Sequence, residues 1–285
     1  MVFGEIVFVV FCVKKSVKLL MRRLMSENKL SKNPISVCLM QLKFSEIASM
    51  RSYISEIQDS YRKKGLPFFK EGKSQRIERG QPDNVRVFDF DFFVFHDAEQ
   101  TELVQLTENS FSYHVYSYQG YEKTKERFIQ LFEIVSRICD FSTVTIISFG
   151  LRYANAIEGP NWRDYLDKDF FWMSIKSPYI VQNGFDSVSA LEMVPTSFGD
   201  GNHGLLKTQL LQNTDGLTVP PDIMTIAPQK LASGKKVSAL DIDHIVPFKK
   251  GVSIPEVFSV IDGVHDVCHD VFFGIISEKA RKEWQ

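Results

Sequence analysis

Residues 86–95 read RVFDFDFFVF, and their strict alternation determines the class of fold. A β-strand turns successive side chains to opposite faces, so four apolar residues share one face of this stretch: Phe88, Phe90, Phe92 and Val94. Asp89 and Asp91 alternate with them on the other face. The pattern predicts a half-buried antiparallel strand, with one face in the core and the other in solvent.

The rest of the first half predicts further strands and two helices. Strands are predicted at 35–44, 101–107 and 110–118. Residues 35–44 (ISVCLMQLKF) are apolar at both alternating positions, which is typical of a central strand covered on both faces. Apolar residues at helical spacing predict helices at 45–64, with Ser45 as the N-cap, and at 121–139. The polar residues 66–85 are expected to form a loop.

The second half shows the same kinds of pattern. Strands are predicted at 143–157, 170–176, 187–195, 204–213 and 236–248. A short helix is expected at 161–170 and a long one at 255–274, followed by a final helix that Ser277 caps and that ends at Trp284. Two segments rich in Gly, Pro, Asp and Asn are predicted to be loops: 196–203 and 214–235.

Runs of strands between single helices predict an α+β fold, with a mainly antiparallel sheet and helices packed largely on one face. Residues 25–285 are expected to form a single domain. Its halves, about 33–141 and 142–285, each end in a helix after a set of strands. This order suggests two similar halves, although no sequence repeat supports a duplication.

Composition limits the function classes. The 285-residue chain is 44% hydrophobic and 24% charged, as in an ordinary globular protein, and its 24 Phe predict an aromatic core. A net charge of -1 provides no whole-chain basic field for nucleic acid. The cysteines form no CxxC pair, which argues against a cysteine zinc site and against a disulfide framework. The chain has four cysteines, Cys12, Cys38, Cys139 and Cys268, and three of them sit in apolar runs, which is typical of reduced cysteines in a cytoplasmic protein.

Residues 1–24 form a doubtful N-terminal extension. Their apolar run VFGEIVFVVFCV (2–13) is shorter than the about 20 residues that a transmembrane helix needs. Its positive charges follow the apolar run, whereas those of a secretory signal precede it. We therefore expect no transmembrane span and a mis-assigned start, with Met25 opening the chain; a helix at a membrane surface is the alternative.

The motif HDVCH places His265 and His269 four residues apart on a helix, with Asp266 beside them. The two imidazoles share one helix face and could bind a metal, in a pattern similar to the zinc-protease motif with Asp in place of Glu. No third ligand is identifiable in the sequence. The alternative is a half-buried helix in which His265 is hydrogen-bonded to a neighbouring strand. We therefore expect no metal and no cofactor.

Two further motifs supply polar candidates. LDIDH puts Asp241 and Asp243 on one face of a strand, where paired carboxylates hold a divalent cation or act as acid and base, or simply form a solvated face. RYAN supplies Arg152 and Asn155 as donors for an anion or for a partner's carboxylate. Alternatively, Arg152 pairs with a buried acid such as Asp241. No nucleophile, P-loop or dinucleotide motif is present in the sequence, so the catalytic residues are unknown.

Four sets of segments, in this order, resemble a sporadically distributed bacterial family of conserved hypothetical proteins without an established activity. They are VQLTENSFSYHVYSY with YEKTKERFIQLFE, GLRYANAIE, ALDIDH, and IDGVHDVCHDVFFGIISEKARKEW. The match covers about residues 33–284, and the pattern RYxN…LDID…H…F…W ends here in His265, Phe272 and Trp284, while His269 has no counterpart. The resemblance implies that six residues matter for packing or for chemistry: Arg152, Tyr153, Asn155, Asp241, Asp243 and His265.

These observations favour a non-enzymatic protein-interaction or regulatory factor, such as an immunity or antitoxin-like protein with a partner encoded nearby. The patchy distribution of the family implies an association with mobile or defence islands. The alternatives are a metal-assisted hydrolase or a small-ligand-binding protein that uses Arg152, Asp241, Asp243 and His265. Convergence of these residues in one open cleft would favour a site, whereas scattering or mutual pairing would favour structural roles. The oligomeric state is not predicted.

Overall fold

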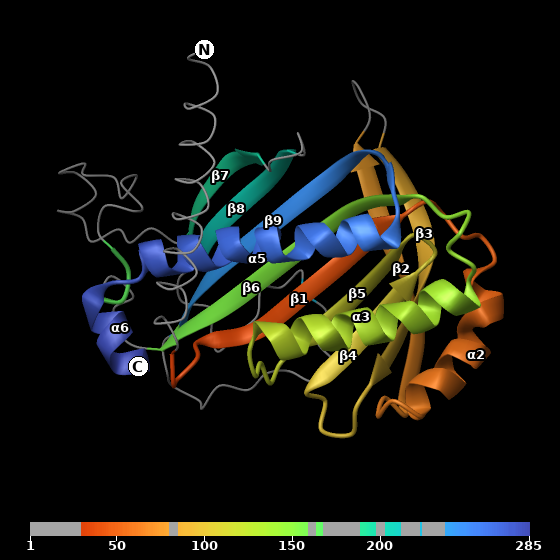
Figure 1. Cartoon of the computed structure of the whole chain (residues 1–285), viewed down its shortest axis with the longest axis horizontal. Helices are drawn as coiled ribbons and strands as arrows, with labels where there is room; N and C mark the ends of the chain where they lie inside the picture. Colours follow the sequence, from red (N-terminus) through yellow and green to blue (C-terminus); the bar gives the residue numbers. More distant parts are fainter. Residues whose placement is uncertain are drawn as a thin grey trace, which may run out of the picture.

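A single sheet organises the chain. The computed structural model describes residues 30–79, 85–158, 164–167, 189–197, 203–211, 223 and 237–285. Within them the sheet has nine strands in the order β2-β3-β4-β5-β1-β6-β9-β8-β7, and every neighbouring pair is antiparallel (Figure 1). The prediction of an α+β fold with a mainly antiparallel sheet is confirmed.

The bounds of the elements follow the predicted patterns closely in most places. The strands are β1 (Ile35–Phe44), β2 (Phe68–Arg79), β3 (Val85–His96), β4 (Glu102–Thr107), β5 (Ser110–Val115), β6 (Ile146–Glu158), β7 (Ser189–Ser197), β8 (His203–Leu211) and β9 (Val237–Val252). The helices are α2 (Met50–Arg62), α3 (Tyr121–Ile138), α5 (Ile254–Ile275) and α6 (Glu278–Trp284).

The main core lies between the helices and one face of the sheet. α3 and α5 both lie across this helix-covered face (Figure 1). Alternate residues of β1 are buried in the core there: Cys38, Met40, Leu42 and Phe44. The ring centroid of Phe111 on β5 lies 5.4 Å from that of Phe128 and 5.3 Å from that of Phe132, both on α3. The core is therefore aromatic, as the Phe content predicts.

The second face of the sheet carries a smaller apolar cluster near its centre. Val37 on β1 and Ala154 on β6 pack there with Ile223, and all three side chains are buried. Leu39 and Tyr116 pack against this cluster and are partly buried. The first part of β1 is thus covered on both faces, as its apolar pattern predicts, whereas Lys43 near its end is exposed.

Two local predictions are wrong. Residues 68–79 of the polar segment 66–85 do not form the predicted loop but the strand β2, which pairs with β3 from Phe68–His96 to Arg79–Val85. An edge strand needs pairing on one side only and tolerates charged residues, which hide its periodicity. Ser45 is not the N-cap of α2, since that helix begins at Met50. The Ser45 hydroxyl oxygen instead accepts a hydrogen bond from the Thr145 amide at 3.0 Å, which links the chain after β1 to the segment before β6.

The helix-end prediction at Ser277 is confirmed, because its hydroxyl oxygen accepts a hydrogen bond from the Ala280 amide at 3.2 Å. Among the helices of the described residues, none is both long and apolar enough to cross a membrane. Several predictions lie wholly or mostly outside the described residues: the extension at 1–24, the helix at 161–170, the strand at 170–176 and the loops at 196–203 and 214–235.

The strand order can be followed outward from the contact between β1 and β6. From β1 the successive strands are β5, β4, β3 and β2, and from β6 they are β9, β8 and β7. In each direction the strands run in reverse chain order, and a helix, α3 or α5, follows the strand next to the centre. This arrangement is what two similar halves at about 33–141 and 142–285 would produce, and the division stays a prediction.

Candidate functional site

The sheet separates the six polar residues that the sequence singled out. Tyr153 on β6 belongs to the core under the helices, whereas its neighbour Ala154 packs on the second face. Because side chains alternate along a strand, Arg152 lies on the second face with Ala154, and Asn155 lies on the helix-covered face with Tyr153. On β9 the same alternation, with Ile242 in the core, puts two carboxylates on the second face: Asp241 and Asp243. His265 belongs to α5, on the helix-covered face.

Arg152 and Asp241 form a buried bidentate ion pair. Nε of Arg152 donates to Oδ1 of Asp241 and Nη2 donates to Oδ2, each at 2.8 Å. Both residues are buried, and Asp241 is 0% exposed. The register places Asp243 directly opposite Arg152, so the guanidinium reaches diagonally to Asp241. The sequence left two roles open for Arg152, binding an anion or a partner's carboxylate, and pairing with a buried acid. The structure shows the pairing with Asp241.

Asn155 joins β6 to β9 through the backbone. Its Nδ2 donates to the carbonyl oxygen of Leu240 at 3.0 Å and to that of Tyr153 at 3.3 Å. The residue is 1% exposed, and its Oδ1 is buried without a hydrogen-bond partner. The side chain therefore stabilises the strand pair from within the core.

His265 lies between β6 and α3. Its Nδ1 is 3.0 Å from the Tyr153 hydroxyl, and its ring stacks on Tyr121 with centroids 3.6 Å apart. Burial, and then the neighbouring His269, lower the pKa of His265 to about 3. A neutral imidazole can accept the Tyr153 hydroxyl proton in a hydrogen bond, so we assign Tyr153 as the donor. This arrangement matches the alternative in which His265 is bonded to a neighbouring strand.

A second set of contacts holds α3 against α5 beside His265. The Tyr121 hydroxyl donates to Oδ1 of Asp262 at 2.6 Å, and Nζ of Lys125 donates to the same oxygen at 2.5 Å. Lys125 and Tyr121 belong to α3, and Asp262 lies one helical turn before His265 on α5. The polar groups around His265 therefore connect the two long helices.

The geometry does not bring metal ligands together in the described residues. The rings of His265 and His269 are 5.8 Å apart, and His269 also packs on Phe273 at 4.5 Å. Asp241 and Asp243 lie on the other face of the sheet, and Asp241 binds Arg152. No three His, Cys, Asp or Glu side chains of the described residues form a group that could hold a metal ion.

The sequence reasoning missed His114, whose ring has no hydrogen-bond partner among the residues that the structure describes. It lies on the second face of β5, where it is 2% exposed and neither ring nitrogen has a hydrogen-bond partner. On β1, Leu39 pairs with His114 of β5 on one side and with Arg152 of β6 on the other. Burial, and then the charge of Arg152, lower the pKa of His114 to about 3. The alternation Ser112, His114, Tyr116 in SFSYHVYSY was the available signal, because it puts polar groups opposite an aromatic face.

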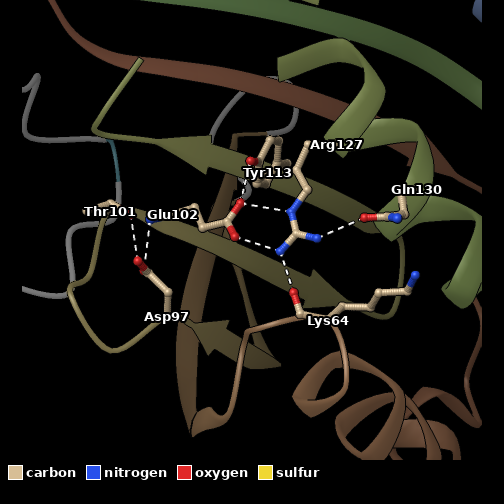
Figure 2. Close-up of polar contacts among 7 residues, drawn as sticks. All are labelled: Lys64, Asp97, Thr101, Glu102, Tyr113, Arg127 and Gln130. Carbon is tan, nitrogen blue, oxygen red and sulfur yellow. Dashed lines mark hydrogen bonds and ion pairs between the residues drawn. The ribbon is translucent and has the colours of Figure 1, made fainter. Parts of the chain in front are cut away.

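The sequence also gave no sign of a polar network around Arg127 (Figure 2). Nη2 of Arg127 donates to Glu102 Oε1 and to the Lys64 carbonyl oxygen, both at 2.6 Å. Nε of Arg127 donates to the second oxygen of Glu102 at 3.1 Å, and the Tyr113 hydroxyl donates to that oxygen at 2.5 Å. Gln130 accepts from the remaining guanidinium nitrogen at 2.9 Å. The network connects α3 to β4 and to the end of α2.

Replacing Arg127 with Met is expected to lower the free energy of unfolding by about 1–2 kcal/mol, because Glu102 and the Lys64 carbonyl each lose a charged donor. Urea unfolding followed by circular dichroism measures the loss. The control is Arg62→Met, which breaks only an exposed pair with Asp59. A loss no larger than that of the control would show that the network contributes nothing to stability.

No protein-family model matches the chain, and no curated protein matches it significantly. The resemblance to the sporadically distributed bacterial family stays a prediction.

Proposed function

We propose that this protein is a non-enzymatic protein-interaction factor, of the regulatory, immunity or antitoxin-like kind, that acts in the bacterial cytoplasm. The observation that carries the proposal is an exposed apolar surface where the sheet ends in β7. Four residues form this surface, which we call the β7 patch: Leu191, Met193, Leu205 and Ile245, exposed by 52%, 53%, 39% and 41%. The buried free cysteines support a reducing compartment: Cys38, Cys139 and Cys268.

The strand register makes the β7 patch continuous. Pro195 on β7 pairs with Leu205 on β8, which in turn pairs with Ile245 on β9. Leu191 and Met193 precede Pro195 by even numbers of residues, so their side chains point to the same, second face. Scattered surface apolar residues are common, but a contiguous group of them marks an interaction surface.

The two edges of the sheet differ in a way that supports this proposal. The β2 edge carries Lys70, Glu71 and Lys73, which are charges of the kind that keep other strands away. Glu192 is the only charged residue of β7. β7 is therefore the edge that fits an added strand with apolar side chains, bound through main-chain hydrogen bonds.

The test is retention of a partner by the affinity-tagged protein in its native host. We expect wild-type protein to retain a stoichiometric protein and Leu205→Glu to weaken its binding by about tenfold, because a charge then enters the apolar contact. The matched control is Val87→Glu on β3, since Val87 is 53% exposed and lies far from β7 in the strand order. The proposal fails if wild-type protein retains neither a different protein nor an untagged second copy of the chain, or if both variants bind equally well.

A small-ligand-binding protein is the second candidate, and His114 favours it. A neutral imidazole has one donor and one acceptor, and burying both unpaired is unfavourable. A ligand or a water molecule on the second face would supply the hydrogen-bond partner that the described residues do not give His114. For the metal-assisted hydrolase the geometry gives less support, because Asp241 and Asp243 lie on the face of the sheet opposite to His265.

A further inference from the structure

Among the described residues no strand pairs with the outer edge of β7, which presents a short row of backbone groups there. Within the ladder, Pro195 pairs with Leu205 on β8. Proline has no N–H, so in a strand it is placed where its nitrogen faces away from the neighbouring strand. Backbone groups alternate in direction along a strand, so the N–H and C=O groups of three residues share the free edge with Pro195: Ser189, Leu191 and Met193.

This row is self-complementary about Leu191. If two copies of β7 pair antiparallel with Leu191 opposite Leu191, Ser189 of each copy lies opposite Met193 of the other. All the N–H groups in this pairing are present, and Pro195 falls beyond its end. An axis at Met193 would instead place Pro195 opposite Leu191, where a ladder hydrogen bond is lost.

Charge supports the same alignment. Glu192 is the only charged residue of β7, and the axis at Leu191 places it opposite Ala190 of the other copy. No like charges are then directly opposed, which is the arrangement that stabilises a strand pair. The β2 edge offers no such match, because Lys70, Glu71 and Lys73 follow one another at its exposed positions. Pairing β7 with β2 of another copy would also leave free edges and build an open filament.

We propose that the partner of the β7 edge is a second copy of this chain, paired antiparallel about a two-fold axis at Leu191. The inference rests on the proposed function and names the partner. The two sheets become one across the axis, and the β7 patches of both copies form one apolar surface on the second face. Leu191 contacts its own counterpart, so the chemistry of this single position controls the assembly.

The experiment introduces a charged residue at position 191 of the full chain. Sedimentation equilibrium and light scattering measure the oligomeric state. Wild-type protein is expected to be a dimer. Leu191→Lys and Leu191→Glu are each expected to weaken dimerisation by at least about tenfold, because like charges meet at the axis. An equimolar mixture of the two variants is expected to recover dimers, since opposite charges then meet. Val87→Lys is the control and is expected to dimerise like wild-type protein.

Leu191 is exposed, so these variants are expected to fold, and circular dichroism checks this. A monomeric wild-type protein, or a dimer that neither single variant weakens, would overturn the inference. Single variants that dissociate without recovery in the mixture would also exclude the axis at Leu191. A monomeric chain that still retains a different stoichiometric protein through the β7 patch would overturn the second-copy inference and leave the proposed function standing.

Discussion

Replacing Asp241 with Ala is expected to lower the free energy of unfolding by about 3–5 kcal/mol, because a buried guanidinium loses the carboxylate that accepts two of its hydrogen bonds. Both Arg152 atoms that pair with Asp241 do so at 2.8 Å, and the Asp241 side chain is 1% exposed. Water replaces the lost charge poorly in such a place, so Asp241 no longer offsets the desolvation penalty of Arg152. Urea unfolding at neutral pH measures the change.

Two further variants test whether Asp241→Ala destabilises the protein because it breaks the buried pair with Arg152. Asp59→Ala breaks an exposed pair with Arg62 and is expected to change stability by less than about 0.5 kcal/mol. Replacing both Arg152 and Asp241 with Leu is expected to be less damaging than Asp241→Ala alone, because the guanidinium is then removed together with the carboxylate that it binds. If the double variant were the least stable of all, mutual pairing would not be the main role of these residues.

Replacing His114 with Leu is expected to make the protein less sensitive to acid. The pKa of His114 is lowered from 6.5 to about 3, so the unfolded chain binds a proton between these values and the folded chain does not. Stability from this group is therefore fully present above pH 6.5 and is lost as the pH falls towards 3. Each pH unit below 6.5 lowers the free energy of unfolding by about 1.4 kcal/mol through this group. By pH 5 His114 therefore lowers it by about 2 kcal/mol.

The measurement compares unfolding free energies at pH 7 and pH 5. At pH 7 His114→Leu is expected to be neutral or stabilising, since it removes two unpaired polar atoms from the interior. The control is His203→Leu, because His203 is exposed. His265, His244 and His269 also have lowered pKa values. Their contribution to the loss of stability in acid is the same in wild-type protein and in both variants. Equal loss of stability in His114→Leu and wild-type protein would contradict the expectation.

Local periodicity made most of the fold predictable. The alternation at 86–95 gave β3, and the helical spacing at 255–274 gave α5 within one residue at each end. β2 was missed because its charged sequence has no alternation, and only its pairing with β3 makes it a strand. Ser45 was misread because its hydroxyl oxygen pairs with Thr145, 100 residues further along the chain. Contacts of this kind leave no local pattern.

The candidate site was predictable only as a set of residues. The sequence motifs named Arg152, Asp241 and His265, and alternation by itself already separates Arg152 from Tyr153. His114 went unnoticed because a histidine on a strand is ordinary until its burial and lack of partners are known. The exposure of the β7 patch also depends on strand order, since Leu191 and Ile245 are far apart in the sequence.

The sequence by itself determined most of the elements and the class of fold, because the periods of buried side chains, two in a strand and 3.6 in a helix, are local properties of the chain. Only the tertiary structure decided which face of the sheet the helices cover, which carboxylate Arg152 binds and which edge stays apolar and exposed. Those outcomes depend on burial and on contacts between residues distant in sequence, where each polar group must find a partner or remain without one.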